Sequence, residues 1–363
     1  MAHDAADAFD RLRLIRSPNV GPVSYRQLIA RFGSASKALE ALPDLSARAG
    51  GRKFVAASEA VIENEMDRLA RAGARYLFID DADYPSLLRE IENAPPVLTY
   101  RGSIGFAGKV NVAMVGARNA SAAGCRMARQ IAQELGDRGI VVTSGLARGI
   151  DAAAHQGGLA TGTIAVIAGG IDNIYPPEHA QLQAQIAEQG LLIAEMPPGI
   201  EPRARHFPYR NRIIAGISAG TVVVEAIPKS GSLITARQAG EAGREVMAIP
   251  GSPLDPRSRG CNQLIRDGAT LVQDAGEIAE LIAPLDHRVR SRALAQTQFE
   301  FVAEAGDGER KAIFELLSTN FAAIDELVRL SGMPSAQVQM VLLELELAGR
   351  LERGAGAKVR LTA

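Results

Sequence analysis

Residues 140–160 read Ile-Val-Val-Thr-Ser-Gly-Leu-Ala-Arg-Gly-Ile-Asp-Ala-Ala-Ala-His-Gln-Gly-Gly-Leu-Ala, which is a short apolar run, a glycine-rich turn and a helical segment in direct succession. The same order recurs along the chain, with helical segments such as 122–137, 150–160 and 233–242. Strands that alternate with helices are typical of α/β proteins, so we predict a doubly wound, mostly parallel sheet. Its expected strands are residues 111–115, 140–143, 163–167, 191–194, 221–225, 245–249 and 270–272.

The segments that flank this α/β stretch differ from it in composition and in the spacing of their apolar residues. Near the N-terminus, apolar residues recur at the spacing of amphipathic helices. The Pro95-Pro96 pair and the glycines that follow it, up to residue 108, are typical of a linker. A polar, charge-mixed run after the α/β stretch indicates a second linker. The predicted domains are an N-terminal helical domain at 1–75, a core at 76–285, the second linker at 286–307 and a third unit at 308–363.

The composition narrows the class of protein. Of the 363 residues, 47% are apolar, which is enough for two or three domains. No run approaches the roughly 18 apolar residues of a membrane span, and the first residues lack the order of a signal peptide, so we expect a cytoplasmic protein without membrane contact. Two cysteines without CxxC spacing and five scattered histidines predict neither a disulfide nor a metal site. The formal charge of −1 gives no general sign of a nucleic-acid partner.

Glycine-rich turns follow several of the predicted strands. Such a turn between a parallel strand and a helix presents backbone N–H groups and the positive end of the helix dipole, which together bind anions. No turn matches G-x-x-x-x-G-K-[ST] or G-x-G-x-x-G, so we expect neither nucleotide hydrolysis nor a dinucleotide cofactor. Two turns carry an arginine, which favours phosphate binding over simple turn closure. The turns are residues 116–119, 144–151, 230–235 and 250–252.

An arginine- and aromatic-rich segment, residues 203–212, reads Arg-Ala-Arg-His-Phe-Pro-Tyr-Arg-Asn-Arg and lies in a stretch, 202–224, without any acidic residue. Guanidinium groups hold phosphates, and an aromatic face stacks on an unpaired base for about 1 to 3 kcal/mol. The segment predicts contact with single-stranded nucleic acid, because so many arginines without an acidic partner would repel one another unless an anion lay among them. The alternative is a solvated loop whose rings, Phe207 and Tyr209, cover the core.

Acidic residues near the expected sheet edge are the candidates for catalysis. Asp151 and His155 share one helical face and could form an acid–base pair. A structural role is favoured, in which Asp151 bonds N–H groups of the first helical turn and His155 bonds its carboxylate. Glu195 and Glu225 each follow an apolar strand, but no nucleophile or metal site accompanies them. We therefore expect a protein that is not an enzyme and that needs no cofactor.

Five motifs at the ends of the expected strands belong together. They are Met114-Val115-Gly116-Ala117-Arg118, the run from Ser144 to His155, the run from Phe207 to Gly216, the run from Ser230 to Ala236, and Ile249-Pro250-Gly251-Ser252. Together they resemble the DprA/Smf (DNA-processing protein A) family over about residues 110–283. The resemblance implies an extended Rossmann-like core that binds single-stranded DNA and works as a homodimer. It also implies a recombination mediator that protects incoming DNA and helps to load the RecA recombinase during natural transformation.

The resemblance further implies which residues contact DNA. Family members use the arginine of the first glycine turn and basic residues around a central pocket, which correspond to Arg118, Arg210 and Arg212. Ser144, Gly145 and Ser232 correspond to backbone or hydroxyl donors. One departure lies at 178–181, where Glu-His-Ala-Gln replaces the asparagine and basic residues of many members, and we expect less positive charge there. The predicted DNA-binding residues are Gly116, Arg118, Ser144, Gly145, Arg148, Phe207, Arg210, Asn211, Arg212, Ser230, Gly231, Ser232 and Thr235.

The terminal segments resemble two small domains of the same family. Residues 18–33 are similar to its sterile-alpha-motif or helix-hairpin-helix-like domain, but Pro22 has no N–H to offer a phosphate, which favours packing or partner docking. Residues 308–363 are similar to a winged helix. Its presumed recognition helix, 335–346, has two acidic residues and no basic one, so we expect a protein-interaction module. Val338, Val341 and Leu345 are either this domain's own core, the commoner outcome, or a partner contact.

Two other functions stay open. A nucleotide-processing enzyme of the Rossmann-like phosphoribohydrolase type would have a similar topology, with a glutamate and a glycine-rich turn at the sheet edge. Its usual Pro-Gly-Gly-x-Gly-Thr run is absent, and Ser-Gly-Ser-Leu-Ile-Thr stands in the comparable place at 230–235. A pure interaction scaffold that uses the terminal domains is the weaker alternative.

Overall fold

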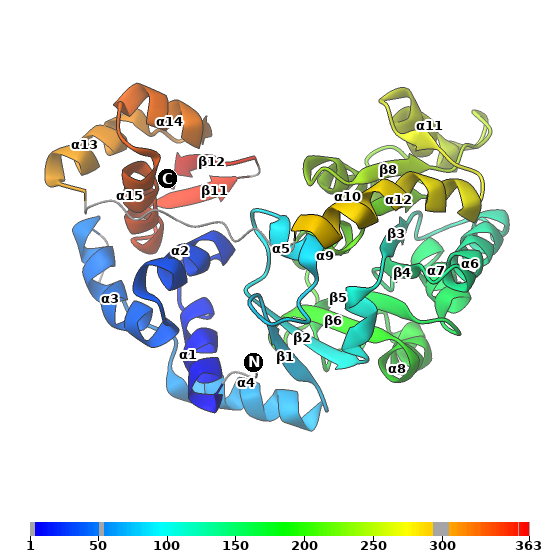
Figure 1. The fold of residues 1–363 in the computed structure, drawn as a ribbon, viewed down its shortest axis with the longest axis horizontal. Coiled ribbons are helices and arrows are strands. Elements are labelled where there is room, and N and C mark those ends of the chain that lie inside the picture. Colours follow the sequence, from blue (N-terminus) through cyan, green and yellow to red (C-terminus); the bar gives the residue numbers. More distant parts are fainter. Residues whose placement is uncertain (1–3, 51–53, 293–304, 355, 363) are drawn as a thin grey trace. The chain divides into compact units, whose positions relative to one another are not determined.

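The computed structural model describes residues 4–50, 54–292, 305–354 and 356–362, which divide into two compact units (Figure 1). One unit comprises Asn64–Ala295, and the other combines Met1–Glu63 with Gln296–Ala363. The two ends of the chain therefore belong to one unit, although the whole α/β core separates them in sequence.

The larger unit is built on a nine-stranded sheet with the strand order β1-β2-β6-β5-β4-β3-β7-β8-β9. From β6 to β9 in this order all neighbours pair in parallel, while β2 pairs antiparallel with both β1 and β6. The predicted α/β fold with a mostly parallel sheet is confirmed. The strands are β1 Arg75–Phe78, β2 Val97–Gly102, β3 Asn111–Val115, β4 Val141–Ser144, β5 Thr163–Gly170, β6 Leu191–Met196, β7 Gly220–Val223, β8 Glu245–Ala248 and β9 Thr270–Leu271.

The antiparallel edge of the sheet shows that one expectation was wrong. β2 occupies residues that we interpreted as part of a linker, and its first three residues are buried. The Pro95-Pro96 pair precedes the strand and marks its beginning. Gly102 ends it with φ +98°, and a Cβ at this position would lie 2.3 Å from the Gly190 carbonyl oxygen. The glycine thus permits a close approach of two backbones.

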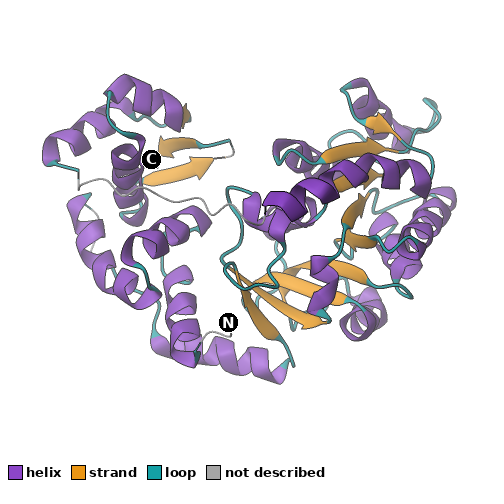
Figure 2. Cartoon of the chain, in the orientation of Figure 1, coloured by secondary structure: helices purple, strands orange, loops and turns teal. Residues whose placement is uncertain are grey.

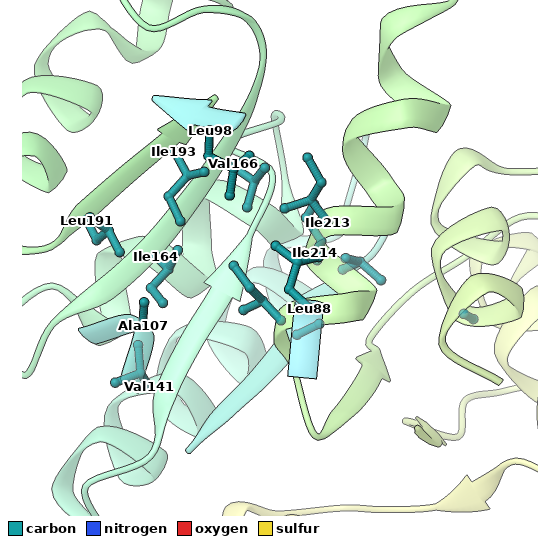
Figure 3. Packing of buried hydrophobic residues seen from close by; sticks show 14 of the residues in the cluster. Leu88, Leu98, Ala107, Val141, Ile164, Val166, Leu191, Ile193, Ile213 and Ile214 are labelled. Atoms are coloured by element: carbon teal, nitrogen blue, oxygen red, sulfur yellow. The ribbon is translucent and has the colours of Figure 1, made fainter. Parts of the chain in front are cut away.

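Helices cover both faces of the sheet (Figure 2). All five residues of β3 are buried, and the side chains from Val112 to Val115 alternate between two hydrophobic cores. In the core of Figure 3, Ile213 and Ile214 lie with strand residues such as Ile164 and Val166. Burial on both faces explains why these strands appear in the sequence as continuous apolar runs.

The helices of this unit include one, α4 Glu59–Arg71, that crosses the boundary between the units. Among the described residues, no helix has both the length and the apolar character needed to cross a membrane. Besides α4, the larger unit has the helices α5 Ser86–Glu90, α6 Ala122–Asp137, α7 Ile150–Gly158, α8 Ala180–Gln189, α9 His206–Ile217, α10 Gly231–Glu241, α11 Arg259–Arg266 and α12 Ala275–Arg292. Its short 3-10 helices are η1 Ile104–Gly108, η2 Pro177–His179 and η3 Pro256–Ser258.

The smaller unit contains N-terminal helices and a winged helix, as predicted. The winged helix has three helices and a small sheet with the order β10-β12-β11. Val338, Val341 and Leu345 lie in its own core, which is the commoner of the two outcomes that the sequence left open. The elements of the unit are α1 Ala5–Ile15, α2 Pro22–Phe32, α3 Ala35–Arg48, α13 Asp307–Leu316, β10 Ala322–Ala323, α14 Ile324–Ser331, α15 Ser335–Leu347, β11 Leu351–Gly354 and β12 Lys358–Leu361.

Candidate nucleic-acid interface

A pocket of about 130 Å³ lies at the carboxyl edge of the sheet. Parallel strands end at the same edge, so the loops that follow β3, β4 and β5 meet there. The amino-terminal part of α9 supplies the remaining wall. The lining residues are Arg118, Gly145, Leu146, Ala147, Arg148, Ile167, Ala168, Gly169, Asn173, Tyr175, Pro176, Pro177, Phe207 and Arg210.

The loop after β4 is held in place from below by Asp151. One carboxylate oxygen of this residue, Oδ2, accepts hydrogen bonds from the backbone N–H groups of Gly145 (3.1 Å) and Ala147 (3.3 Å). Gly149 has φ +74°, and a Cβ there would lie 2.3 Å from the Ala117 carbonyl oxygen, so only glycine lets the loops after β3 and β4 pack this closely. Asp151 therefore has the favoured structural role, although its N–H donors belong to the loop before the helix.

Arg210 reaches the pocket from α9 and is buried, with 7% of its surface exposed. Its guanidinium lies against Gly145, where an added Cβ would come within 1.3 Å of Nη1. Burial lowers the pKa of Arg210 to about 10, with the charge of Arg118 acting in the same direction and that of Asp151 opposing it. The side chain is still a cation at neutral pH. Its Nε has no hydrogen-bond partner among the described residues.

The electrostatic effect of Arg210 on Asp151 is mutual. Burial raises the pKa of Asp151, while Arg210, the two backbone N–H donors and Arg118 all act to lower it. A buried carboxylate and a buried guanidinium thus stabilise each other's charged forms. The pocket wall keeps a cation whose hydrogen-bonding capacity is not filled by the protein.

Phe207 forms the centre of a cation and aromatic cluster at the pocket. The Arg118 Cζ lies 5.1 Å from the ring centroid, and the Arg210 Cζ lies 5.9 Å from it. The Tyr175 ring is 5.8 Å away and tilted by 58°. Arg118 is exposed and forms no salt bridge within the described part of the chain. Cations and aromatic faces in one pocket suit the phosphates and unpaired bases of a single strand.

Arg148 also lines the pocket, but its charge is partly neutralised. It forms an exposed ion pair with Glu178, one of the residues at which this chain departs from the family pattern. The hydrogen bond between the two side chains raises the pKa of Arg148 and lowers that of Glu178. The acidic residue at this rim therefore reduces the positive charge that faces the pocket.

Arg212 lies outside the pocket lining and has a different partner. It is 6% exposed and forms an ion pair with Glu195, the second-last residue of β6. The premise that the arginines of residues 203–212 lack an acidic partner was therefore wrong for Arg212, because the partner comes from another strand. The Ser144 hydroxyl donates to the Met114 carbonyl (2.6 Å), so its proton is not free for a ligand. Gly116 supports the loop from outside the lining, and a Cβ there would lie 2.5 Å from Ile150.

The remaining predicted residues form a separate cluster where α10 begins. Asn211 Nδ2 donates to the Gly231 carbonyl oxygen at 3.4 Å. The hydroxyls of Ser230 and Ser232 are 2.8 Å apart, and Thr235 is buried in the next helical turn. None of these residues lines the pocket at the ends of β3 to β5.

The candidate acid–base pair does not form. The Nδ1 atom of His155 is 2.9 Å from the Thr163 hydroxyl, so the expected bond from His155 to Asp151 was wrong. Complete burial, with a further effect of Arg210, lowers the pKa of His155 to about 3 and keeps the ring neutral. Within the described residues no group of three potential ligands could hold a metal ion.

Glu225, the other acidic candidate, is tied to a helix terminus. It accepts hydrogen bonds from the Ser121 backbone N–H (2.8 Å) and hydroxyl (2.5 Å) at the beginning of α6. A carboxylate at this place complements the helix dipole. The position is consistent with a structural role.

The sequence analysis missed the contribution of the loop after β5. Asn173 and Tyr175 line the pocket, and Tyr175 also contacts Phe207. The signal in the sequence is the Tyr175-Pro176-Pro177 run, which directly precedes the departure at 178–181. An aromatic residue beside prolines, in the loop that follows a buried strand, is the available indication of a pocket wall.

Fold and pocket together define an α/β protein with an arginine- and aromatic-lined pocket at the carboxyl edge of a mostly parallel sheet. A model of the family described as DNA recombination-mediator protein A matches residues 75–283. Models of a DprA-like N-terminal HHH domain and a DprA winged helix domain match residues 5–67 and 298–357. The chain belongs to this DprA/Smf family.

Individual relatives are similar over most of the chain. Protein Smf of Synechocystis is 33% identical and covers 93% of this chain and 95% of its own length. DNA processing protein DprA of Streptococcus pneumoniae is 45% identical over 56% of this chain and 72% of its own length. The X-ray structure of DprA from S. pneumoniae has a TM-score of 0.64 at 35% identity and covers 77% of this chain and 98% of its own. A Helicobacter pylori structure that concerns the single-stranded DNA binding mode of DprA has a TM-score of 0.54 at 25% identity and covers 60% of this chain and 98% of its own.

Proposed function

We propose that this protein binds single-stranded DNA in the pocket at the carboxyl edge of the sheet and acts as a recombination mediator. The observation that carries the proposal is Arg210, a buried cation at the pocket wall whose Nε has no partner among the described residues. A buried charge is stable only when it is paired and hydrogen-bonded. The charge of Asp151 acts on Arg210, but the Asp151 carboxylate is hydrogen-bonded to the loop N–H groups. A phosphate in the pocket would face the positive charges of Arg210 and Arg118 together and would compensate them.

The aromatic residues beside these arginines favour DNA strands over free inorganic anions. The Phe207 ring centroid lies 5.1 and 5.9 Å from the two guanidinium carbons, and the Tyr175 ring lies 5.8 Å from that of Phe207. Stacking on such rings adds about 1 to 3 kcal/mol per base. A duplex keeps its bases stacked on one another, so it gains nothing from these rings. The pocket therefore favours single strands.

The direct test is fluorescence anisotropy with labelled oligo-dT and with a duplex of equal length, at several salt concentrations. We expect tighter binding of the single strand and a logarithm of affinity that falls linearly with that of the salt concentration. Arg118→Ala should reduce the salt slope by about 0.7, the value for one phosphate of a single strand. Arg126→Ala, which removes an exposed arginine of α6 outside the pocket, is the matched control. Equal affinity for both DNA forms, or a slope that Arg118→Ala leaves unchanged, contradicts the proposal.

We propose further that the protein works without chemical turnover. The support is the state of the acidic residues: Glu225 is bound at the beginning of α6, and Glu195 is paired with Arg212. Incubation with nucleoside monophosphates and with DNA tests this. Release of free base that disappears in Glu225→Gln would replace the proposal with a phosphoribohydrolase activity.

Membership of the family supports the rest of the proposal, namely that the protein is a homodimer that protects incoming strands and helps to load RecA during natural transformation. Light scattering coupled to size-exclusion chromatography tests the dimer. RecA filament formation on strands that are already coated with single-strand-binding protein tests the loading. A protein that is monomeric at all concentrations contradicts the proposed homodimer. Filament formation that the protein does not accelerate contradicts the proposed loading of RecA.

A further inference from the structure

Helix α15, the presumed recognition helix of the winged helix, is buried on two opposite faces. Leu343 and Leu347, each 1% exposed, share a hydrophobic core with α1, α2 and α3, and Met340 packs against the same core. At 3.6 residues per turn, this second face lies about half a turn around the axis from the first. The first face packs into the winged-helix core through Val338, Val341, Leu342 and Leu345.

Polar contacts surround this second face. The Gln27 amide of α2 donates to Gln339 Oε1 at 3.0 Å. Asn19, in the hairpin before α2, donates from Nδ2 to the Leu347 carbonyl oxygen at 3.2 Å, so it satisfies one of the last carbonyls of α15. Arg350 Nη1 donates to the Ala49 carbonyl oxygen at 2.9 Å. An apolar centre with a hydrogen-bonded rim is the usual composition of a specific interface.

The acidic residues of α15 are occupied within the winged helix itself. Arg310 donates to both carboxylate oxygens of Glu344, at 2.8 and 3.0 Å. Arg353 donates to Glu346 at 2.8 Å. Neither carboxylate is therefore available to attract a basic partner. What α15 presents away from its own domain is an apolar surface.

A winged helix that reads duplex DNA places the face opposite its core in the major groove. Here that face is the one that contains Gln339, Leu343 and Leu347, and the N-terminal helices cover it. We propose that α15 is an intramolecular docking helix, whose partner is the N-terminal helical domain of the same chain and not a DNA groove. This inference is independent of the pocket at the sheet edge.

Hydrogen exchange measured by mass spectrometry on the full-length protein tests the docking. In Leu343→Glu we expect the amides of α1 to α3 to exchange about tenfold faster or more, because a buried carboxylate opens the interface. The amides of α13 and α14 and the affinity for oligo-dT should stay unchanged. Leu330→Glu, at a residue of α14 that is 54% exposed, is the matched control and should exchange like the unmodified protein.

Several outcomes would overturn the proposal. Unchanged exchange in α1 to α3 of Leu343→Glu means that the contact does not form in solution. Faster exchange in α13 and α14 as well means that Leu343 belongs to the winged-helix core. Loss of protection on dilution of the unmodified protein points to a second copy as the partner, and loss of protection on addition of duplex shows that a DNA groove competes for the same face.

A milder set of variants tests the same contact without a buried charge. Gln27→Ala and Gln339→Ala each remove one partner of a single hydrogen bond between the domains. If the bond forms, the effects of the two substitutions on exchange in α2 are not additive in the double variant. Additive effects would contradict the proposed contact.

Discussion

Gly145→Ala is the substitution that the pocket geometry constrains most sharply. An added Cβ would lie 1.3 Å from Nη1 of Arg210, 2.3 Å from Cζ and 2.8 Å from Nη2. An ordinary contact needs about 3.4 Å or more, so the guanidinium must retreat by about 2 Å into the pocket or away from it. Arg210 is only 7% exposed, so the surrounding side chains leave its guanidinium few other positions at the pocket wall. We therefore expect the displaced guanidinium to lose its contact with the phosphate.

A hydrogen bond to a charged group contributes about 1.5 to 3 kcal/mol, so single-strand affinity should fall by about 10- to 150-fold. The salt slope should fall by about 0.7 if one phosphate contact disappears. Fluorescence anisotropy with oligo-dT over a salt series measures both quantities, and circular dichroism verifies that the variant is folded. The expected loss comes from displacement of one cation and not from a change in net charge.

The matched control is Gly231→Ala. Gly231 is another predicted DNA-binding glycine, but a Cβ there meets nothing within 4 Å. Its substitution should leave affinity and slope unchanged. If Gly145→Ala binds like the unmodified protein, Arg210 does not hold the strand. If both variants lose affinity equally, the effect does not arise from the clash with Arg210.

Three further outcomes are expected. Asp151→Asn keeps an oxygen for the two loop N–H groups but removes the negative charge beside Arg210, so oligo-dT should bind more tightly. Weaker binding in the same assay would show that the charge is needed to hold the loop. His155, with a folded-state pKa of about 3, stays neutral while the unfolded chain takes up a proton, so stability should fall by about 1.4 kcal/mol per pH unit between about pH 6.5 and 3. His155→Asn should flatten this dependence in urea unfolding at pH 7 and 5, and an identical pH dependence in the variant contradicts the assignment. A chain that ends after Leu285 should keep its single-strand affinity within about tenfold but lose protection in α1 to α3, and a greater loss of affinity would place the winged helix in the binding surface.

The order of elements could be predicted from the sequence because it is encoded locally. Apolar runs, glycine turns and helical spacing are properties of neighbouring residues, and they were enough to predict the parallel strands. The winged helix was expected from the resemblance to the family. The meeting of Arg118, Gly145 and Arg210 at one place also follows, because parallel strands and the helices that follow them bring their loops to one edge of the sheet. Strand β2 was missed because the prolines and glycines beside it carry the same local signal as a linker.

Partners that come from distant elements could not be predicted in this way. Arg212 looked unpaired because no acidic residue is near it in sequence, yet the end of β6 brings Glu195 to it. His155 has Asp151 four residues away on its own helix, but packing against β5 gives it Thr163 instead. The sequence of α15 contains the apolar residues Leu343 and Leu347 on a second face. Only the tertiary structure shows that residues about three hundred positions earlier cover this face. Local pattern determines which faces must be buried, and the packing of whole elements decides what buries them.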